Sequence, residues 1–147
     1  CKRALEATGG DIQAAQKHLR EQGMAAAEKK ADRVTAQGVI ESYIHAGGRI
    51  GALIEVNCET DFVARTEEFQ RLAKELAMQV AAMKPDVVRE EDLTEDIQRT
   101  PDHEPVLLKQ PYIRDQSKTV AQLINEAISR TGENIQVRRF QRFELGA

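Results

Sequence analysis

The sequence contains no tryptophan, and aromatic residues make up only 4% of its 147 residues. This composition offers too little stacking surface for a typical platform that binds single-stranded nucleic acid. No apolar run approaches the ~18 residues that a membrane-spanning helix needs. We therefore expect a mostly aliphatic core, no membrane-spanning segment and no direct contact with nucleic acid.

Cysteine is also scarce, because Cys1 and Cys58 are the only two in the sequence. Two cysteines are too few for a disulfide framework, and no pair of cysteines or histidines has zinc-finger spacing. Glu59 and Asp61 follow Cys58 closely, and their negative charges disfavour a reactive thiolate. The cysteine usage predicts a reducing, cytoplasmic compartment, and we expect no metal site.

Motifs of catalysis are missing as well. Residues 47–51 (GGRIG) contain three glycines, but a phosphate-binding loop ends in Gly-Lys-Ser/Thr and leads into a helix, whereas here a strand pattern follows. Neither a Gly-x-Ser-x-Gly sequence nor a dinucleotide-binding fingerprint occurs. We predict a protein that is not an enzyme, has no catalytic residues and needs no cofactor.

The remaining composition is that of an ordinary folded domain, with 41% hydrophobic and 31% charged residues and a net charge of −3. Residues 39–45 and 49–57 are rich in β-branched side chains and flank a glycine turn, which predicts a β-hairpin. Amphipathic helices are expected to begin at Thr66 and Thr119, and residues 134–145 form a last strand. The order predicts an α+β fold, with a small antiparallel three-stranded sheet covered by helices.

The chain divides into three parts by pattern. Residues 1–23 predict a truncated helical N-terminal module whose last helix ends at Gly23, and residues 24–38 predict a helical linker. Residues 39–147 form the α+β core. Within it, residues 85–105 hold eight acidic side chains and three prolines, which indicates an acidic connecting loop.

The last predicted strand has an inconsistent alternation. Val137 shares one parity with Phe143 and Leu145, while Phe140 has the other, so the strand needs either a bulge or burial on both faces. A three-stranded sheet with helices on one face leaves either Phe140 or Phe143 uncovered. We therefore predict a two-fold homodimer, in which a second copy covers that side chain.

Arginines gather on the same strand at Arg138, Arg139 and Arg142. Arginines beside aromatic residues suit contacts with RNA phosphates and bases. Arginines that alternate along a strand are more often its solvent-exposed face. An RNA- or ribosome-associated binding protein is therefore the alternative interpretation of this sequence.

The connection at residues 57–65 (NCETDFVAR) carries apolar side chains where a polar loop is expected. Burial of a side chain as large as Phe62 contributes about 1.5–3 kcal/mol, so an exposed position would lose that stability unless a partner covers it. Two explanations stay open: Phe62 tucks under its own helix, or it is a contact for another molecule.

Residues 51–65 (GALIEVNCETDFVAR) resemble the signature of the bacterial elongation factor Ts family, which carries a Thr-Asp-Phe-Val motif after a strand. Further stretches agree. Residues 1–6 (CKRALE) and 10–12 (GDI) are similar to the family's ubiquitin-associated-like N-terminal domain. Residues 43–45 (YIH) fit its core hairpin, and residues 132–140 (GENIQVRRF) fit its last core strand.

The resemblance implies a guanine nucleotide exchange factor that binds elongation factor Tu and promotes GDP release by disturbing its magnesium site. The family motif maps onto Thr60, Asp61, Phe62 and Val63. Lys2 and Arg3 are weaker candidates for Tu binding, because the resemblance begins inside the family's N-terminal domain. The chain carries one copy of the core unit, as in short members that pair as homodimers, and residues 85–111 are shorter than the family pattern.

Overall fold

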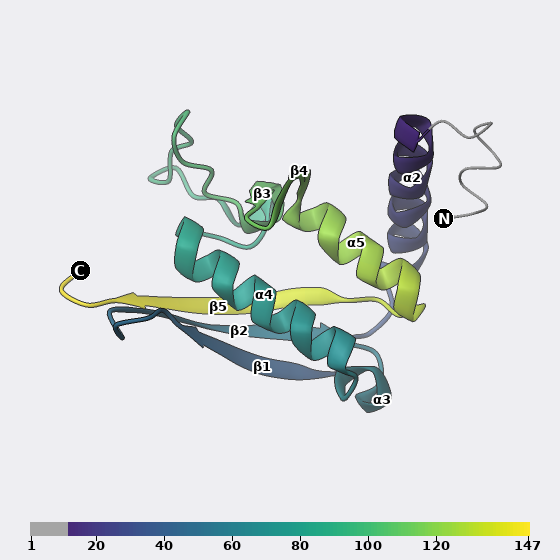
Figure 1. Cartoon of the computed structure of the whole chain (residues 1–147), viewed down its shortest axis with the longest axis horizontal. Coiled ribbons are helices and arrows are strands. Elements are labelled where there is room, and N and C mark those ends of the chain that lie inside the picture. Colours follow the sequence, from purple (N-terminus) through teal and green to yellow (C-terminus); the bar gives the residue numbers. More distant parts are fainter. Residues whose placement is uncertain (1–11) are drawn as a thin grey trace.

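A computed structural model describes residues 12–147, which form three antiparallel strands on one side and helices on the other (Figure 1). The first part of the predicted N-terminal module, with the candidates Lys2 and Arg3, lies outside the described residues. The ubiquitin-associated-like character of the N-terminal module therefore stays a prediction.

The main sheet consists of β1 (Gln37–Ile44), β2 (Ile50–Cys58) and β5 (Gln136–Glu144), hydrogen-bonded in the order β1-β2-β5. Both pairings are antiparallel, which confirms the predicted sheet. The hairpin turns through Gly47 and Gly48, whose φ angles of 97° and 69° are accessible to glycine at no steric cost. The glycine-rich residues thus serve a turn, as predicted.

A β-bulge in β5 explains the irregular alternation of its side chains. Glu55 of β2 pairs with Arg139, but its neighbour Val56 pairs with Val137, so Arg138 is the extra residue. The bulge reverses the alternation between its two sides. As a result Val137 and Phe140 both face the core, whereas Phe143 and Leu145 face outward.

The inner face of the sheet is covered by α4 (Glu67–Met83) and α5 (Val120–Thr131) (Figure 1). Each helix begins at the predicted threonine: Thr66 accepts a hydrogen bond from a backbone N–H of α4, and Thr119 does the same for α5. Gly132 ends α5 in the left-handed conformation.

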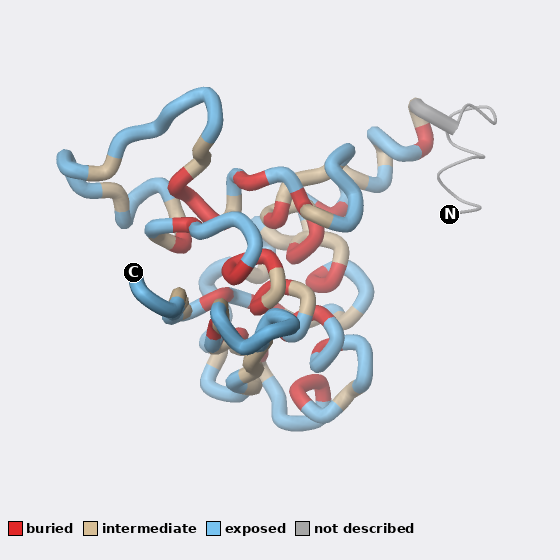
Figure 2. The backbone as a smooth tube through the Cα atoms, turned by 60° about the vertical axis from the view of Figure 1, so that its left-hand side comes forward, coloured by how far each residue is buried: buried red, intermediate tan, exposed pale blue. Residues whose placement is uncertain are grey.

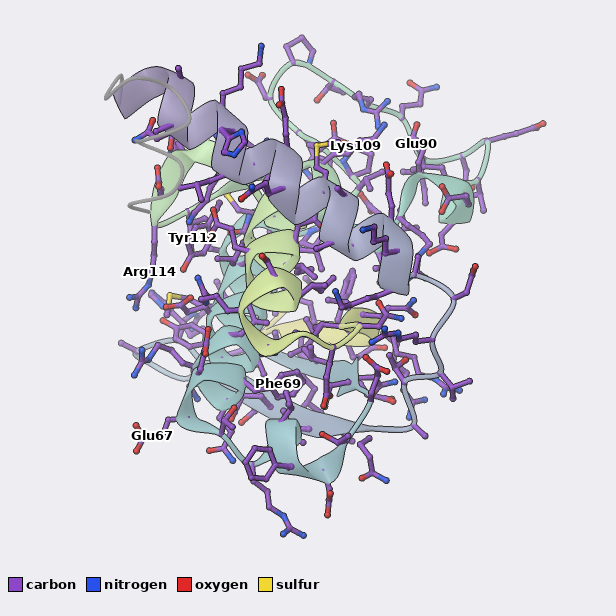
Figure 3. The ribbon with its side chains drawn as sticks, turned by 90° about the vertical axis from the view of Figure 1, so that its right-hand side faces the viewer. Glu67, Phe69, Glu90, Lys109, Tyr112 and Arg114 are labelled. Carbon is purple, nitrogen blue, oxygen red and sulfur yellow. The ribbon has the colours of Figure 1, made fainter. Side chains whose placement is uncertain are left out.

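The core fills the space between these helices and the sheet, where Figure 2 shows the buried segments gathered. Phe69 points inward from α4, whereas Glu67 at the start of the same helix points into solvent (Figure 3). The largest fully buried apolar side chains are aliphatic apart from this one phenylalanine: Phe69, Ile54, Leu76, Leu107, Val56 and Val80.

The N-terminal helix corrects one prediction. Helix α2 runs without interruption over Ile12–Lys30, so the prediction that a helix ends at Gly23 was wrong. A Cβ added at Gly23 would lie 3.7 Å from the backbone of Asn125, which shows that α2 packs closely on α5 at this point. The close packing holds the helix together despite the low helix propensity of glycine.

A second, small hairpin was not predicted: β3 (Pro111–Tyr112) pairs with β4 (Asp115–Thr119). It is attached to α4 by a buried amide pair. The side chain of Gln79 donates to the side-chain oxygen of Gln110 at 3.1 Å and to the carbonyl of Pro111 at 3.1 Å. Its own oxygen accepts from the Ile113 N–H at 3.0 Å.

Residues 85–105 form the predicted acidic connection, which is mostly exposed and contains a short 3₁₀ helix, Glu90–Asp92 (Figure 2). Ion pairs connect residues of this loop to one another. Arg99 lies 2.9 Å from Glu90 and 2.8 Å from Glu104, and Lys109 reaches the same Glu90 carboxylate at 2.9 Å (Figure 3). Hydrogen bonds from Lys109 and Arg99 lower the pKa of Glu90.

Candidate functional site

The candidate site is the turn between β2 and α4, which contains the four-residue helix α3 (Asp61–Ala64). Thr60 caps this helix, because its hydroxyl oxygen accepts a hydrogen bond from the Val63 N–H at 3.3 Å. The Thr66 hydroxyl then donates to the Val63 carbonyl at 2.7 Å and accepts from the Phe69 N–H at 3.2 Å. Two successive threonine caps therefore define the path of the turn.

Phe62 projects from this turn into solvent, with 78% of its surface exposed. The explanation that it tucks under its own helix is therefore wrong. Its neighbours Val63 and Ala64 are buried, with only 7% and 5% of their surfaces exposed. Val63 thus anchors α3 to the core, and the turn presents Phe62 outward from a fixed base.

Asp61 is also exposed and lies 3.3 Å from Arg65, one helical turn away. An ion pair this open to solvent contributes little to stability. The carboxylate therefore remains accessible beside Phe62, and the two side chains form one small exposed surface.

Cys58 supports the turn from beneath, since its thiol is fully buried and donates to the Thr60 carbonyl at 3.1 Å. Burial and, to a smaller extent, the negative charge of Glu133 raise the pKa of this thiol to about 11. The group is a neutral thiol at physiological pH, as predicted. Burial rather than the adjacent Glu59 is the main reason.

Two glutamates link the turn to the connection between α5 and β5. The Glu133 carboxylate accepts hydrogen bonds from the backbone N–H groups of Glu59 at 3.1 Å and Thr60 at 3.0 Å, and from the Thr60 hydroxyl at 2.6 Å. In return, the Glu59 carboxylate accepts from the Asn134 N–H at 2.7 Å and lies 3.5 Å from Arg33. We call this reciprocal arrangement of Glu59 and Glu133 the carboxylate clasp.

Sequence reasoning missed the clasp. Its two glutamates are 74 residues apart in the chain and lie in two separate connections, residues 57–65 and the link between α5 and β5. The one available signal was that both segments, residues 51–65 and 132–140, carried the family resemblance.

The alternative of an RNA-associated protein depended on three arginines of the last strand, and these do not share one surface. Arg138 and Arg139 lie 4.0 and 2.9 Å from the Glu55 carboxylate, which offsets their charge. Arg142 points to the opposite side of the sheet, where it donates to the Ala81 carbonyl at 3.0 Å and to Glu144 at 3.0 Å. This arrangement offers no continuous basic surface for phosphates.

The outer face of the sheet carries an apolar patch and is not covered by any element of residues 12–147 (Figure 1). Ile40 and Ile44 of β1, Leu53 of β2 and Phe143 of β5 are exposed on it. A shallow hollow of about 560 Å³ lies over this face, next to Ile44, Leu53 and Phe143. Exposed apolar patches of this kind mark interaction sites.

Other candidate chemistry is not assembled in the described part of the chain. Each histidine bonds to a different neighbour: His18 to Gln22, His45 to Tyr43, and His103 to Asp86. Among residues 12–147, no group of three His, Cys, Asp or Glu side chains could hold a metal ion. Across the same residues, no helix combines the length and the apolar character needed to cross a membrane.

Comparisons with known proteins agree on one family. The family profile described as "Elongation factor TS" matches residues 11–103. A protein named Elongation factor Ts from Desulforamulus reducens is 47% identical, with 99% of this chain and 81% of the relative covered. Proteins of the same name from Thermotoga neapolitana and Methylacidiphilum infernorum are 49% and 48% identical, covering 99% of this chain and 88% and 86% of their own lengths.

The alignments also bear on length. The match to the Desulforamulus reducens protein extends over 175 positions, more than the 147 residues of this chain, so the relative carries residues that are absent here. That the absent residues fall within residues 85–111 stays a prediction.

Proposed function

This chain belongs to the elongation factor Ts family and so has a role in translation elongation, and on that premise we propose that it binds elongation factor Tu and accelerates the release of GDP. The observation that supports this proposal most directly is the exposure of Phe62 on an otherwise anchored turn. The proposed Tu-binding residues are Thr60, Asp61, Phe62 and Val63. Lys2 and Arg3 are weaker candidates.

The proposed mechanism is indirect displacement of a metal. Magnesium requires near-ideal octahedral geometry, with oxygen ligands at about 2.0–2.1 Å, and tolerates small shifts of its ligands badly. Phe62 inserts between supporting elements of Tu and shifts one of them, so nucleotide affinity falls without contact between this chain and the nucleotide. The exposed Asp61 adds polar contacts beside the inserted ring, and Val63 holds the turn.

Linkage makes the exchange reversible. If this chain lowers the affinity of Tu for GDP by some factor, then GDP must lower the affinity of Tu for this chain by the same factor. Rebinding of nucleotide therefore releases the factor. The proposal needs no catalytic residue and no cofactor, since the chain acts by binding, and its place of action is the cytoplasm.

We further propose that two copies of the chain associate through the outer face of the sheet. The argument is that Ile40, Ile44, Leu53 and Phe143 expose an apolar surface that a second copy would cover with its own. The turn that carries Phe62 follows the C-terminal end of β2, whereas the hollow beside Ile44 and Phe143 lies at the hairpin end of the strands. Each dimer would therefore present two Phe62 turns and could bind two Tu molecules.

The decisive test measures the release of fluorescent GDP from elongation factor Tu with and without this chain. Faster release that saturates with factor concentration is expected. Unchanged release would overturn the proposal. RNA binding with a steep dependence on salt, in the absence of any effect on GDP release, would instead favour the RNA-associated alternative.

A further inference from the structure

We propose that Glu133 is a positioning residue for nucleotide exchange, which holds the Phe62 turn in its binding-competent conformation through the carboxylate clasp. This inference rests on the proposed function, because it assigns a role in Tu binding to a residue behind the contact surface. Glu133 lies on the connection between α5 and β5, outside the Thr-Asp-Phe-Val motif.

The first argument is the convergence of three donors on one side chain. Glu133 receives the N–H groups of Glu59 and Thr60 and the Thr60 hydroxyl, all within 3.1 Å. Hydrogen bonds to a charged acceptor are about twice as strong as neutral ones. These two backbone donors immediately precede α3, so the carboxylate fixes the point from which that helix starts.

The second argument concerns the single proton of the Thr60 hydroxyl. A hydroxyl has one donor and two acceptor lone pairs. When its proton is given to Glu133 at 2.6 Å, a lone pair remains free to accept the Val63 N–H at 3.3 Å. Glu133 thereby favours the capping orientation of Thr60, and the cap sets the direction of α3, which carries Phe62.

The third argument is that the clasp joins three separate segments. Arg33, in the segment between α2 and β1, lies 3.5 Å from the Glu59 carboxylate and donates to the Gly132 carbonyl at 3.4 Å. The Asn134 side chain donates to the carbonyls of Arg33 at 2.9 Å and Ala31 at 3.4 Å. The turn is thus attached to the end of α5 and to the segment that follows α2.

These contacts matter because Phe62 itself has little packing to hold it in place. A binding turn that must be ordered during association loses part of its affinity to conformational entropy, and preorganisation avoids that cost. Glu133 supplies the order that the exposed ring cannot obtain from the core.

The test compares Glu133→Ala, Glu133→Gln and the matched control Glu126→Ala. Glu126 lies on α5, where its carboxylate bonds Lys118 at 2.9 Å, away from the turn. Loss of the charged acceptor in Glu133→Ala should lower the exchange efficiency about tenfold. Glu133→Gln keeps an acceptor oxygen and should retain more activity, while Glu126→Ala should match the unmodified chain.

Two further readouts separate positioning from general destabilisation. Amide hydrogen exchange at Glu59 and Thr60 should accelerate in Glu133→Ala, while amides in the centre of α4 stay protected. In addition, Glu133→Ala should cause no further loss of exchange activity when Phe62 is already alanine, because it acts through that ring.

Each outcome is informative. Unchanged amide protection and unchanged GDP release in Glu133→Ala would overturn the positioning role. Fully additive losses with Phe62→Ala would also overturn it, since they would indicate a direct contact with Tu. If the unmodified chain fails to accelerate GDP release, the proposed function falls. The amide measurement would still show whether Glu133 orders the turn.

Discussion

Phe62 and Phe69 lie on consecutive helices and have opposite environments. Phe62 is 78% exposed, whereas Phe69 is 1% exposed and packs among the aliphatic core side chains. The exposed ring contributes little to the fold, which is why we assign it to the proposed contact with Tu. The buried ring is explained by the fold alone.

We therefore expect Phe62→Ala to abolish most of the exchange activity and to leave the free energy of unfolding nearly unchanged. Phe69→Ala is the matched comparison and should cost about 3–5 kcal/mol, the usual effect of deleting a buried phenylalanine. Urea unfolding and GDP-release rates measured on both variants check this. A loss of several kcal/mol in Phe62→Ala would mean that the ring belongs to the core.

The pKa of Cys58 gives a prediction about pH. Its folded-state pKa is about 11, against an ordinary value of 9.0. Between these values the unfolded thiol loses its proton while the folded thiol keeps it, so stability that is present below pH 9 is lost as the pH rises toward 11.

Unfolding of the unmodified chain and of Cys58→Ala at pH 8 and pH 10.5 tests this effect. The stability advantage of the cysteine should shrink by about 2 kcal/mol at the higher pH. The variant carries all other titrating groups and so serves as the control. An advantage that is the same at both pH values would contradict the shift.

At the scale of elements, most of the fold could be predicted from local patterns. The hairpin followed from β-branched residues around two glycines, and α4 and α5 followed from apolar periodicity after a threonine cap. The bulge at Arg138 was anticipated as one of two solutions to a parity conflict. These features are encoded within a few residues of where they appear.

The features that sequence reasoning missed depend on contacts between distant segments. The hairpin of β3 and β4 is held by the buried pair Gln79 and Gln110, and no local pattern pairs two glutamines. The clasp between Glu59 and Glu133 has the same character. Helix α2 continues through Gly23 because α5 lies against it, which outweighs the local helix-ending signal.

Two glycines should respond in opposite ways to alanine. Gly23 lies inside α2 with room for a methyl group, so Gly23→Ala should raise the free energy of unfolding by about 0.5–1 kcal/mol. At Gly38 the φ angle is +153°, and an added Cβ would lie 2.2 Å from the Val56 carbonyl oxygen. Gly38→Ala should therefore destabilise by more than about 1 kcal/mol.

Thermal and urea unfolding of the two variants would check this contrast. A destabilised Gly23→Ala would indicate that α2 and α5 are packed more tightly than described. A neutral Gly38→Ala would indicate that β1 can move away from β2 at this point.

At the scale of the whole molecule, the two faces of the sheet are covered unequally. Helices α4 and α5 cover the inner face of the sheet, whereas the outer face has no covering element among residues 12–147 (Figure 1). The bulge in β5 contributes to this asymmetry, because it turns Phe140 inward and leaves Phe143 outward. An apolar face on the central strand favours pairing with a like face.

Light scattering at micromolar concentration should therefore give about twice the 16.4 kDa mass of the chain. Leu53→Glu places a charge on the central strand of the outer face, where two-fold symmetry brings like charges together, and should yield a monomer. Val34→Glu is the control, because Val34 is an exposed apolar residue in the connection between α2 and β1 and belongs to none of the strands, and it should leave the dimer intact. A monomeric mass for the unmodified chain would refute pairing through this face, and a dimeric Leu53→Glu would place the interface elsewhere.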